Sequence, residues 1–211
     1  MIKGSRPSLL ALKIVANVFV NKRGITIKDI SRNLKTDYKN VYDTVNALFK
    51  TGIIRKEKIG NYNLCSVNMD YDDLIIFLSE HNIYNKLKPF KSRYPTEYRI
   101  IKEACRKNIE NTPCFVCLVF GSYSRGEEKR ISDIDLLFLT PSRPTVNFSK
   151  SIAISNMPYQ KKFHVIAQSI ENFIKDLKKN KLNIATEISK DLPIVFHGID
   201  IFFSMIVRGK V

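Results

Sequence analysis

The chain has 211 residues, of which 44% are hydrophobic, so it can bury a core in one domain of ordinary size or in two small ones. Its formal net charge of +15 favours an anionic partner, with nucleic acid as the first to consider. No stretch approaches the roughly 20 apolar residues that a membrane-spanning helix requires, and residues 1–7 lack the character of a signal peptide. The sequence therefore argues against a membrane partner and predicts a cytoplasmic protein.

The four cysteines are predicted to be small core residues in a reducing compartment. Cys114 and Cys117 have C-x-x-C spacing, but they lie in an apolar, strand-like run that directs them to opposite faces. No second pair completes a zinc site, since Cys65 and Cys105 do not form one. We therefore expect no metal or redox role for these residues.

The N-terminal third is predicted to form helices followed by a hairpin, and it is basic, with 13 Lys and Arg against 5 Asp and Glu in residues 1–70. The hydrophobic spacing and turn signals give helices at residues 8–21, 27–34 and 38–50, then strands at 53–58 and 62–67. Thr26 is placed to cap the second helix, and Gly60-Asn61 to make the hairpin turn. The inward side chains of the third helix are expected to be Val41, Val45, Leu48 and Phe49.

This order of elements, with the stretch GITIKDISRNLKTDYKNVYDTVNALFKTGIIRKEKIGNYNLCSVN, resembles a winged helix-turn-helix domain. The resemblance implies that the third helix enters the major groove of double-stranded DNA and that the hairpin contacts the backbone. Amides would read base edges, and basic side chains would contact phosphates. The expected contact residues are Tyr38, Lys39, Asn40, Tyr42, Asn46, Lys50, Arg55, Lys56 and Lys58. A winged helix used for protein docking stays open, because Asp43 lies in the middle of the same face.

The middle of the chain is predicted to connect two domains. A helix over residues 71–88 is expected to end at Pro89, followed by a short basic connection at 90–94 and a helix over 95–108. We therefore expect a first domain at residues 1–70, a connecting helix and linker at 71–94, and a second domain at 95–211.

The strongest chemical signal is the stretch VFGSYSRGEEKRISDIDLLFL, residues 119–139. An apolar strand over residues 114–120 ends at Gly121-Ser122, where a short helix would present free N–H groups to an anion. Asp133-Ile134-Asp135 then opens a second apolar strand, with both carboxylates on one face. Two like charges this close favour a bound cation, and Mg²⁺ completed by phosphate oxygens fits. Glu127 stands where a Walker A loop needs Lys, so that motif is excluded.

These residues and their spacing resemble the DNA polymerase β-like nucleotidyltransferase superfamily, in particular its minimal nucleotidyltransferase branch, over about residues 95–206. The resemblance implies an α/β (α+β) fold with a short mixed sheet flanked by helices, and transfer of AMP from ATP to an acceptor hydroxyl. It implies that Gly121 and Ser122 contact the β- and γ-phosphates and that Asp133 and Asp135 bind Mg²⁺. It also implies a partner protein as acceptor, such as a HEPN-type toxin, which would make this chain antitoxin-like.

Two arginines are added to the expected phosphate-binding residues on the basis of the sequence alone, not of the resemblance. Arg125 and Arg130 are cations close to the expected phosphate site, and each is equally able to pair with Glu127 or Glu128.

The sequence departs from the family pattern at the third carboxylate, which the next central strand normally supplies. The best candidate strand, residues 162–168, contains His164 but no Asp or Glu. A neutral imidazole can accept a proton, but it is a poor replacement for an oxygen ligand of Mg²⁺. The alternative that His164 is a partly buried strand residue without a catalytic role stays open. The alternative function is therefore a DNA-binding transcriptional regulator with a degenerate, nucleotide-sensing domain. Oligomerisation is compatible with either reading.

Overall fold

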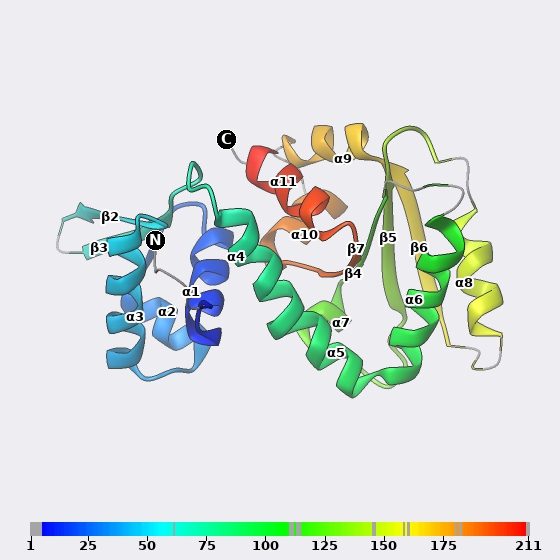
Figure 1. Ribbon diagram of the computed structural model, residues 1–211, viewed down its shortest axis with the longest axis horizontal. Coiled ribbons are helices and arrows are strands. Elements are labelled where there is room, and N and C mark those ends of the chain that lie inside the picture. Colours follow the sequence, from blue (N-terminus) through cyan, green and yellow to red (C-terminus); the bar gives the residue numbers. More distant parts are fainter. Residues whose placement is uncertain are drawn as a thin grey trace. The chain divides into compact units, whose positions relative to one another are not determined.

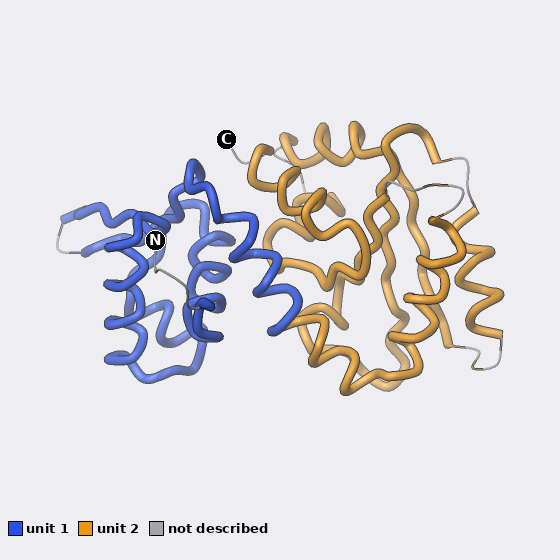
Figure 2. The backbone as a smooth tube through the Cα atoms, in the orientation of Figure 1, with its two compact units in different colours: residues 1–85, 211 blue, residues 86–210 orange. Residues whose placement is uncertain are grey.

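The computed structural model describes residues 6–60, 62–109, 112, 115–144, 147–157, 159, 161–179, 181 and 183–209. The backbone forms two compact units, one over residues 1–85 and the other over residues 86–210 (Figure 2). Among the described residues, no helix combines the length and apolar character needed to cross a bilayer.

The first unit contains helices and an antiparallel sheet with the strand order β1-β3-β2 (Figure 1). Its elements are α1 (Leu9–Val20), β1 (Ile25–Thr26), α2 (Ile27–Leu34), α3 (Tyr38–Thr51), β2 (Ile54–Ile59), β3 (Tyr62–Val67) and α4 (Leu74–His81). Side chains cap the first three helices, since Ser8, Thr26 and Asp37 each accept a hydrogen bond from a backbone N–H in the first turn. The predicted helices and hairpin strands of this region are confirmed.

One inward position of α3 was predicted wrongly. Val41, Val45 and Leu48 are buried, but the Phe49 residue is 47% exposed. Successive residues of a helix are turned by about 100°, so Phe49 points away from the stripe that ends at Leu48. The ammonium group of Lys56 covers its ring instead, 5.1 Å from the ring centroid.

A single helical run leads from the first unit into the second. It consists of α4, the π-helix η1 (Asn82–Leu87) and α5 (Lys88–Arg93), and the division between the units falls within η1. The expectation that this helix ends at Pro89 is wrong. Pro89 lies in the first turn of α5, where its missing N–H and fixed φ are tolerated.

The second unit is built on a mixed sheet with the strand order β6-β5-β4-β7. The strands are β4 (Val116–Phe120), β5 (Ile134–Thr140), β6 (Phe163–Ser169) and β7 (Ile194–His197). β4 is antiparallel to β5 and β7, whereas β5 and β6 are parallel. This agrees with the predicted mixed sheet flanked by helices.

Helices cover both faces of this sheet (Figure 1). The elements are α6 (Pro95–Ile109), α7 (Ser122–Arg125), α8 (Phe148–Asn156), α9 (Ile170–Leu177), α10 (Ile184–Asp191) and α11 (Ile199–Gly209). α5, α6 and α8 share a core cluster with one face, while α9 and α11 pack on the other. Every residue of β4 is buried, as the unbroken apolar run predicts.

Aromatic side chains pack together in the centre of the second unit. The ring of Phe138 on β5 stacks on that of Phe148 on α8, with centroids 4.2 Å apart, and Phe115 packs against both. These rings pack β5, and the residue that leads into β4, against α8.

The three described cysteines lie in the cores of the units. Cys65, Cys105 and Cys117 are buried and carry free thiols, which confirms the prediction for these three, while Cys114 lies outside the described residues. Burial, followed by the neighbouring Cys105 thiol, raises the pKa of the Cys117 thiol well above its ordinary value. A thiol that stays protonated is a poor nucleophile and metal ligand.

Candidate functional site

The chain leaves β4 through a backbone conformation that only glycine adopts readily. Gly121 has φ +69° and ψ −146°. A Cβ built on it would lie 2.6 Å from the Oδ2 atom of Asp135. The carboxylate of Asp135 therefore occupies the space that a side chain at position 121 would need.

The short helix α7 begins directly after this glycine. Its first turn is closed by hydrogen bonds from the Ser124 N–H (3.2 Å) and the Ser124 hydroxyl (2.9 Å) to the carbonyl oxygen of Gly121. The first N–H groups of a helix have no acceptor within the helix. The Ser122 end of α7 thus presents donors of the kind that anionic oxygens accept.

The two acids of the Asp-x-Asp motif lie at the entrance of β5. Asp133 precedes the strand and is exposed; the Asp135 side chain is 29% exposed. Ile134 and Leu136, on the opposite face of the strand from Asp135, are fully buried. Asp135 pairs with Phe120 across β4 and β5, and this register brings it beside Gly121.

His164 lies beside Asp135 on the neighbouring strand. The two residues are register partners in the parallel pairing of β5 and β6, and His164 Nδ1 is 3.1 Å from Asp135 Oδ1. Because a carboxylate only accepts hydrogen bonds, this contact requires the proton of a neutral His164 ring on Nδ1. The Nε2 atom then carries the lone pair, and the imidazole is 61% exposed.

The carboxylates of Asp133 and Asp135 suit a divalent cation only if a bound molecule completes the coordination of the ion. Among the described residues, no three His, Cys, Asp or Glu side chains are grouped so as to hold a metal. Asp133 and Asp135 supply carboxylate oxygens, which a hard cation such as Mg²⁺ prefers, and the nitrogen of His164 does not extend this set. The residues therefore fit an ion shared with phosphate oxygens rather than an ion held by the protein alone.

The two predicted phosphate-binding arginines differ in their surroundings. Arg125 forms ion pairs with Glu127 at 2.7 Å and with Glu187 and Asp191 of α10 at 3.5 Å each. The hydrogen bond to Glu127 raises the pKa of Arg125, against a smaller effect of burial. Arg130 is exposed, and within the described part of the chain it has no ion pair.

A buried acid fixes the connection between α7 and β5. The Glu128 side chain is 6% exposed, pairs with Arg93 of α5 at 2.8 Å, and accepts a hydrogen bond from the Tyr94 hydroxyl. Burial raises the pKa of Tyr94 to about 12, with Glu128 acting in the same direction. Burial also acts to raise the pKa of Glu128, but the hydrogen bonds from Tyr94 and its own backbone, with the Arg93 charge, hold it below its ordinary value.

Lys86 on η1 was not predicted as a site residue. Its ammonium group donates to the carbonyl oxygens of Ser124, at 2.8 Å, and Asp191, at 3.4 Å. These contacts span 38 and 105 residues, so no local pattern could have indicated them.

The residues expected to contact DNA lie on the surface of the first unit. Tyr38, Lys39, Asn40, Tyr42 and Lys50 are exposed on α3, and Arg55 and Lys58 are exposed on β2. Asn46 and Lys56 are only half-exposed, because the Lys56 ammonium donates to the Asn46 side chain and lies 6.0 Å from the Tyr42 ring centroid. Arg55 pairs with Asp70 at 3.2 Å.

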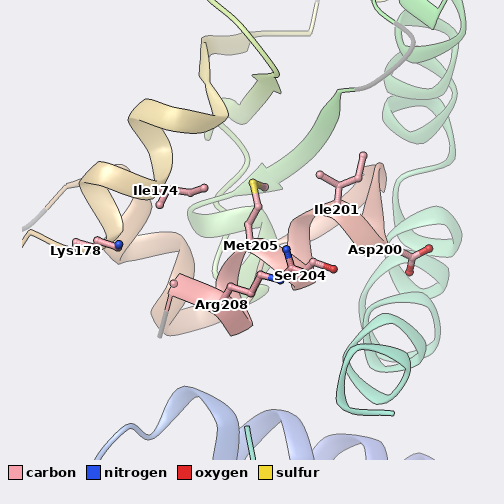
Figure 3. Close-up of a pocket in the computed structure, with 8 residues that line it drawn as sticks. Ile174, Lys178, Asp200, Ile201, Ser204, Met205 and Arg208 are labelled. Carbon is pink, nitrogen blue, oxygen red and sulfur yellow. The ribbon is translucent and has the colours of Figure 1, made fainter. Parts of the chain in front are cut away.

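A separate groove of about 620 Å³ lies between α9 and α11 (Figure 3). It is lined by Ile174, Lys178, Asp200, Ile201, Ser204, Met205, Arg208 and Gly209. None of the predicted site residues lines it.

A comparison with known protein families finds a match that lies within the second unit. The model of the nucleotidyltransferase domain family matches residues 98–195, a span that contains the Gly-Ser turn, the Asp-x-Asp motif and His164. The match supports nucleotidyl transfer as the general activity of this part of the chain, with a nucleoside triphosphate as substrate. No curated protein and no solved structure matches the chain significantly.

Proposed function

We propose that the second unit is a Mg²⁺-dependent nucleotidyltransferase that moves AMP from ATP to an acceptor hydroxyl. The observation that carries the proposal is the contact of Asp135 with Gly121, which joins an acid of the motif to the turn that opens α7. The family match over residues 98–195 supports the same activity in general terms.

In this proposal, residues 121–126 form a phosphate loop. The N–H groups at Gly121 and Ser122, with the Ser122 hydroxyl, hold the β- and γ-phosphates. Asp133 and Asp135 hold Mg²⁺, which when bound neutralises the triphosphate and polarises the α-phosphoryl group. Arg130, which pairs with no acid among the described residues, supplies a cation for the phosphate tail, whereas Arg125 would first have to exchange its carboxylate partners.

His164 takes the role of base. Asp135 orients its ring, so Nε2 accepts the proton of the acceptor hydroxyl while the hydroxyl oxygen attacks the α-phosphorus. The new oxygen–phosphorus bond forms as the bond to the β-phosphate oxygen breaks, and pyrophosphate leaves. The resemblance to minimal nucleotidyltransferases supports a partner protein, of the HEPN toxin type, as the acceptor.

Transfer of label tests the enzyme. The purified chain is incubated with ATP labelled at the α-phosphate, Mg²⁺ and the proteins that co-purify with it. We expect labelled acceptor with the wild type, and at least about a 100-fold lower rate with Asp133→Asn or Asp135→Asn, in line with loss of a transition-state electrostatic contact. Equal transfer by Asp133→Asn would exclude the proposed metal role.

We further propose that the first unit is a winged helix that binds double-stranded DNA. The order of α1, α2, α3 and the β2–β3 hairpin supports it, as do the exposed Lys39, Lys50 and Lys58 around the α3 face. A gel shift on the upstream DNA of its own gene tests this, with Lys39→Ala plus Arg55→Ala as the variant. Unchanged retention of the double variant would argue against docking through this face.

One observation favours a second candidate function. The register partner of Asp135 is a histidine, and no third acid joins the two aspartates among the described residues. This supports a transcriptional regulator whose second unit binds a nucleotide without turnover. ATP binding without any label transfer, combined with DNA retention that changes when ATP is added, is the result expected for that candidate.

A further inference from the structure

The helix α7, which lies within the phosphate loop, and the helix α10 end at the same ammonium group. Lys86 donates to the carbonyl oxygen of Ser124, in the last turn of α7, and to that of Asp191, the last residue of α10. The terminal carbonyls of a helix have no partner within the helix, and a cation there also interacts favourably with the helix dipole. Lys86 therefore acts as a C-terminal cap for both helices.

Besides Lys86, ion pairs between side chains also connect α7 to α10. Arg125, the last residue of α7, contacts the carboxylates of Glu187 and Asp191 on α10, each at 3.5 Å. Leu192, directly after α10, is buried and has a φ of +45°, which is unfavourable for a residue with a side chain. Such backbone persists only where its surroundings hold it, so the junction of α7, α10 and Lys86 is a constrained part of the fold.

The position of Lys86 in η1 is also unusual. π-helices are rare and are often found at functional sites, because the wider turn changes which side chains point to one side. Burial lowers the pKa of Lys86; the Asp191 carboxylate opposes this effect and the Arg125 charge adds to it. A partly buried ammonium group thus lies against the Ser124 carbonyl, within the loop of residues 121–126.

We propose that Lys86 is a positioning residue for nucleotidyl transfer, which by capping α7 and α10 holds the phosphate loop in the geometry that binds the triphosphate. This inference rests on the proposed function. Lys86 acts through the backbone of Ser124, and the hydrogen bonds of Ser124 to the Gly121 carbonyl carry the constraint to the first residue of the loop. Small displacements of a binding group can cost about 100-fold in rate, so a loosened loop would bind phosphate poorly.

The test is a titration of the full-length chain with ATP and Mg²⁺, followed by calorimetry. Lys86→Met keeps the length and the apolar part of the side chain but removes the donor. We expect its Kd for ATP to rise about 10- to 100-fold, the range that corresponds to one lost hydrogen bond from a charged donor. Lys86→Arg keeps a cation that can donate to both carbonyls, and we expect it to recover most of the affinity.

A matched control exists in the same unit. Lys102 of α6 donates to the carbonyl oxygen of Phe196 at 3.3 Å, so Lys102→Met removes a comparable bond away from the loop. We expect it to bind ATP like the wild type. The unfolding free energy of every variant is measured beside the titration, which separates a loss of binding from a loss of folded protein.

The outcomes separate this inference from the proposed function. If the wild type binds ATP and Lys86→Met binds it equally well, Lys86 only stabilises the fold and the inference is overturned. If the wild type binds none of the four nucleoside triphosphates, the proposed function fails, and the inference fails with it. If Lys86→Met does not fold, Lys86→Gln, which has a shorter and uncharged side chain, replaces it. Wild-type affinity of Lys86→Gln would then overturn the inference.

Discussion

The carboxylate of Asp135 takes the place of a side chain at position 121: a Cβ on Gly121 would be 2.6 Å from its Oδ2 atom. His164 Nδ1 contacts the other oxygen of the same carboxylate at 3.1 Å. The end of β4, the start of β5 and the start of β6 are thereby joined through one acidic group, and the predictions for the site follow from this arrangement.

Gly121→Ala is expected to displace Asp135 rather than to unfold the chain. The new methyl group would push the carboxylate away, and the backbone conformation, which is unfavourable for any residue but glycine, adds a cost of about 1–3 kcal/mol in unfolding free energy. We expect a fall in label transfer of about 100-fold, since a catalytic group loses its position. Gly126→Ala is the control, because Gly126 also has a positive φ but a Cβ there meets no atom within 4 Å. Equal transfer by the two variants would contradict the prediction.

Substitution of His164 separates the two candidate functions. If His164 is the base, His164→Gln lowers the rate of transfer by about 10²- to 10⁴-fold, the usual contribution of general base catalysis. His164→Asp supplies a carboxylate beside Asp135, so we expect it to retain transfer and to bind Mg²⁺ more tightly. Metal titration and label transfer are the measurements. Transfer that appears only in His164→Asp, and not in the wild type, would instead support the regulator.

The Tyr94–Glu128 contact predicts a loss of stability at alkaline pH. Burial first, and then the contact with Glu128, raises the pKa of Tyr94 from 10.0 to about 12 in the folded chain, so the stability linked to the protonated hydroxyl is fully present below pH 10. It is lost as the pH rises through the window from 10 to about 12, because the unfolded chain releases the proton first. Denaturant unfolding across this window measures it, and tyrosinate absorbance reports the late ionisation among the nine tyrosines. Tyr94→Phe should show a smaller loss over the same window; an identical loss would refute the assignment.

The exposed rings of α3 predict how the first unit would read DNA. Tyr38 and Tyr42 are 51% and 45% exposed and their rings stack with centroids 6.1 Å apart. In the major groove, the methyl group of thymine is the main apolar feature that such rings can contact. We therefore expect duplexes with uracil in place of thymine to bind about fourfold more weakly for each contacted methyl, from about 0.8 kcal/mol per buried methylene-sized group.

A pair of variants provides the control for this experiment. Tyr42→Ala should reduce the difference between the thymine and uracil duplexes, whereas Lys39→Ala should weaken binding to both by the same factor. Binding without any difference between the two duplexes would exclude apolar readout but leave DNA binding in place.

Local sequence signals were sufficient to predict the site residues that lie close together in the chain. Gly121, Asp133 and Asp135 mark the ends of two apolar runs, and unbroken apolar runs predict strands buried on both faces. The same reasoning placed the strand of His164, and the structure shows the register that makes it the partner of Asp135.

Contacts between distant segments could not be predicted in this way. Lys86, Arg93 and Tyr94 lie in a region expected to be a helix end and a linker, and only the continued helix brings them to Ser124 and Glu128. No prediction was made for the helix α8 either. Its burial rests on Phe148 and Ile152 alone, which is too few apolar residues for a clear helical period.

The helical run from α4 to α5 determines how the protein can be divided into fragments. The family match begins at residue 98, but the second unit begins at Lys86. A fragment that starts at Pro95 would lose Phe90, which is 4% exposed in the core, and would leave Glu128 buried without the cation of Arg93. A fragment that keeps the second unit intact must therefore begin inside the helical run, no later than Lys86.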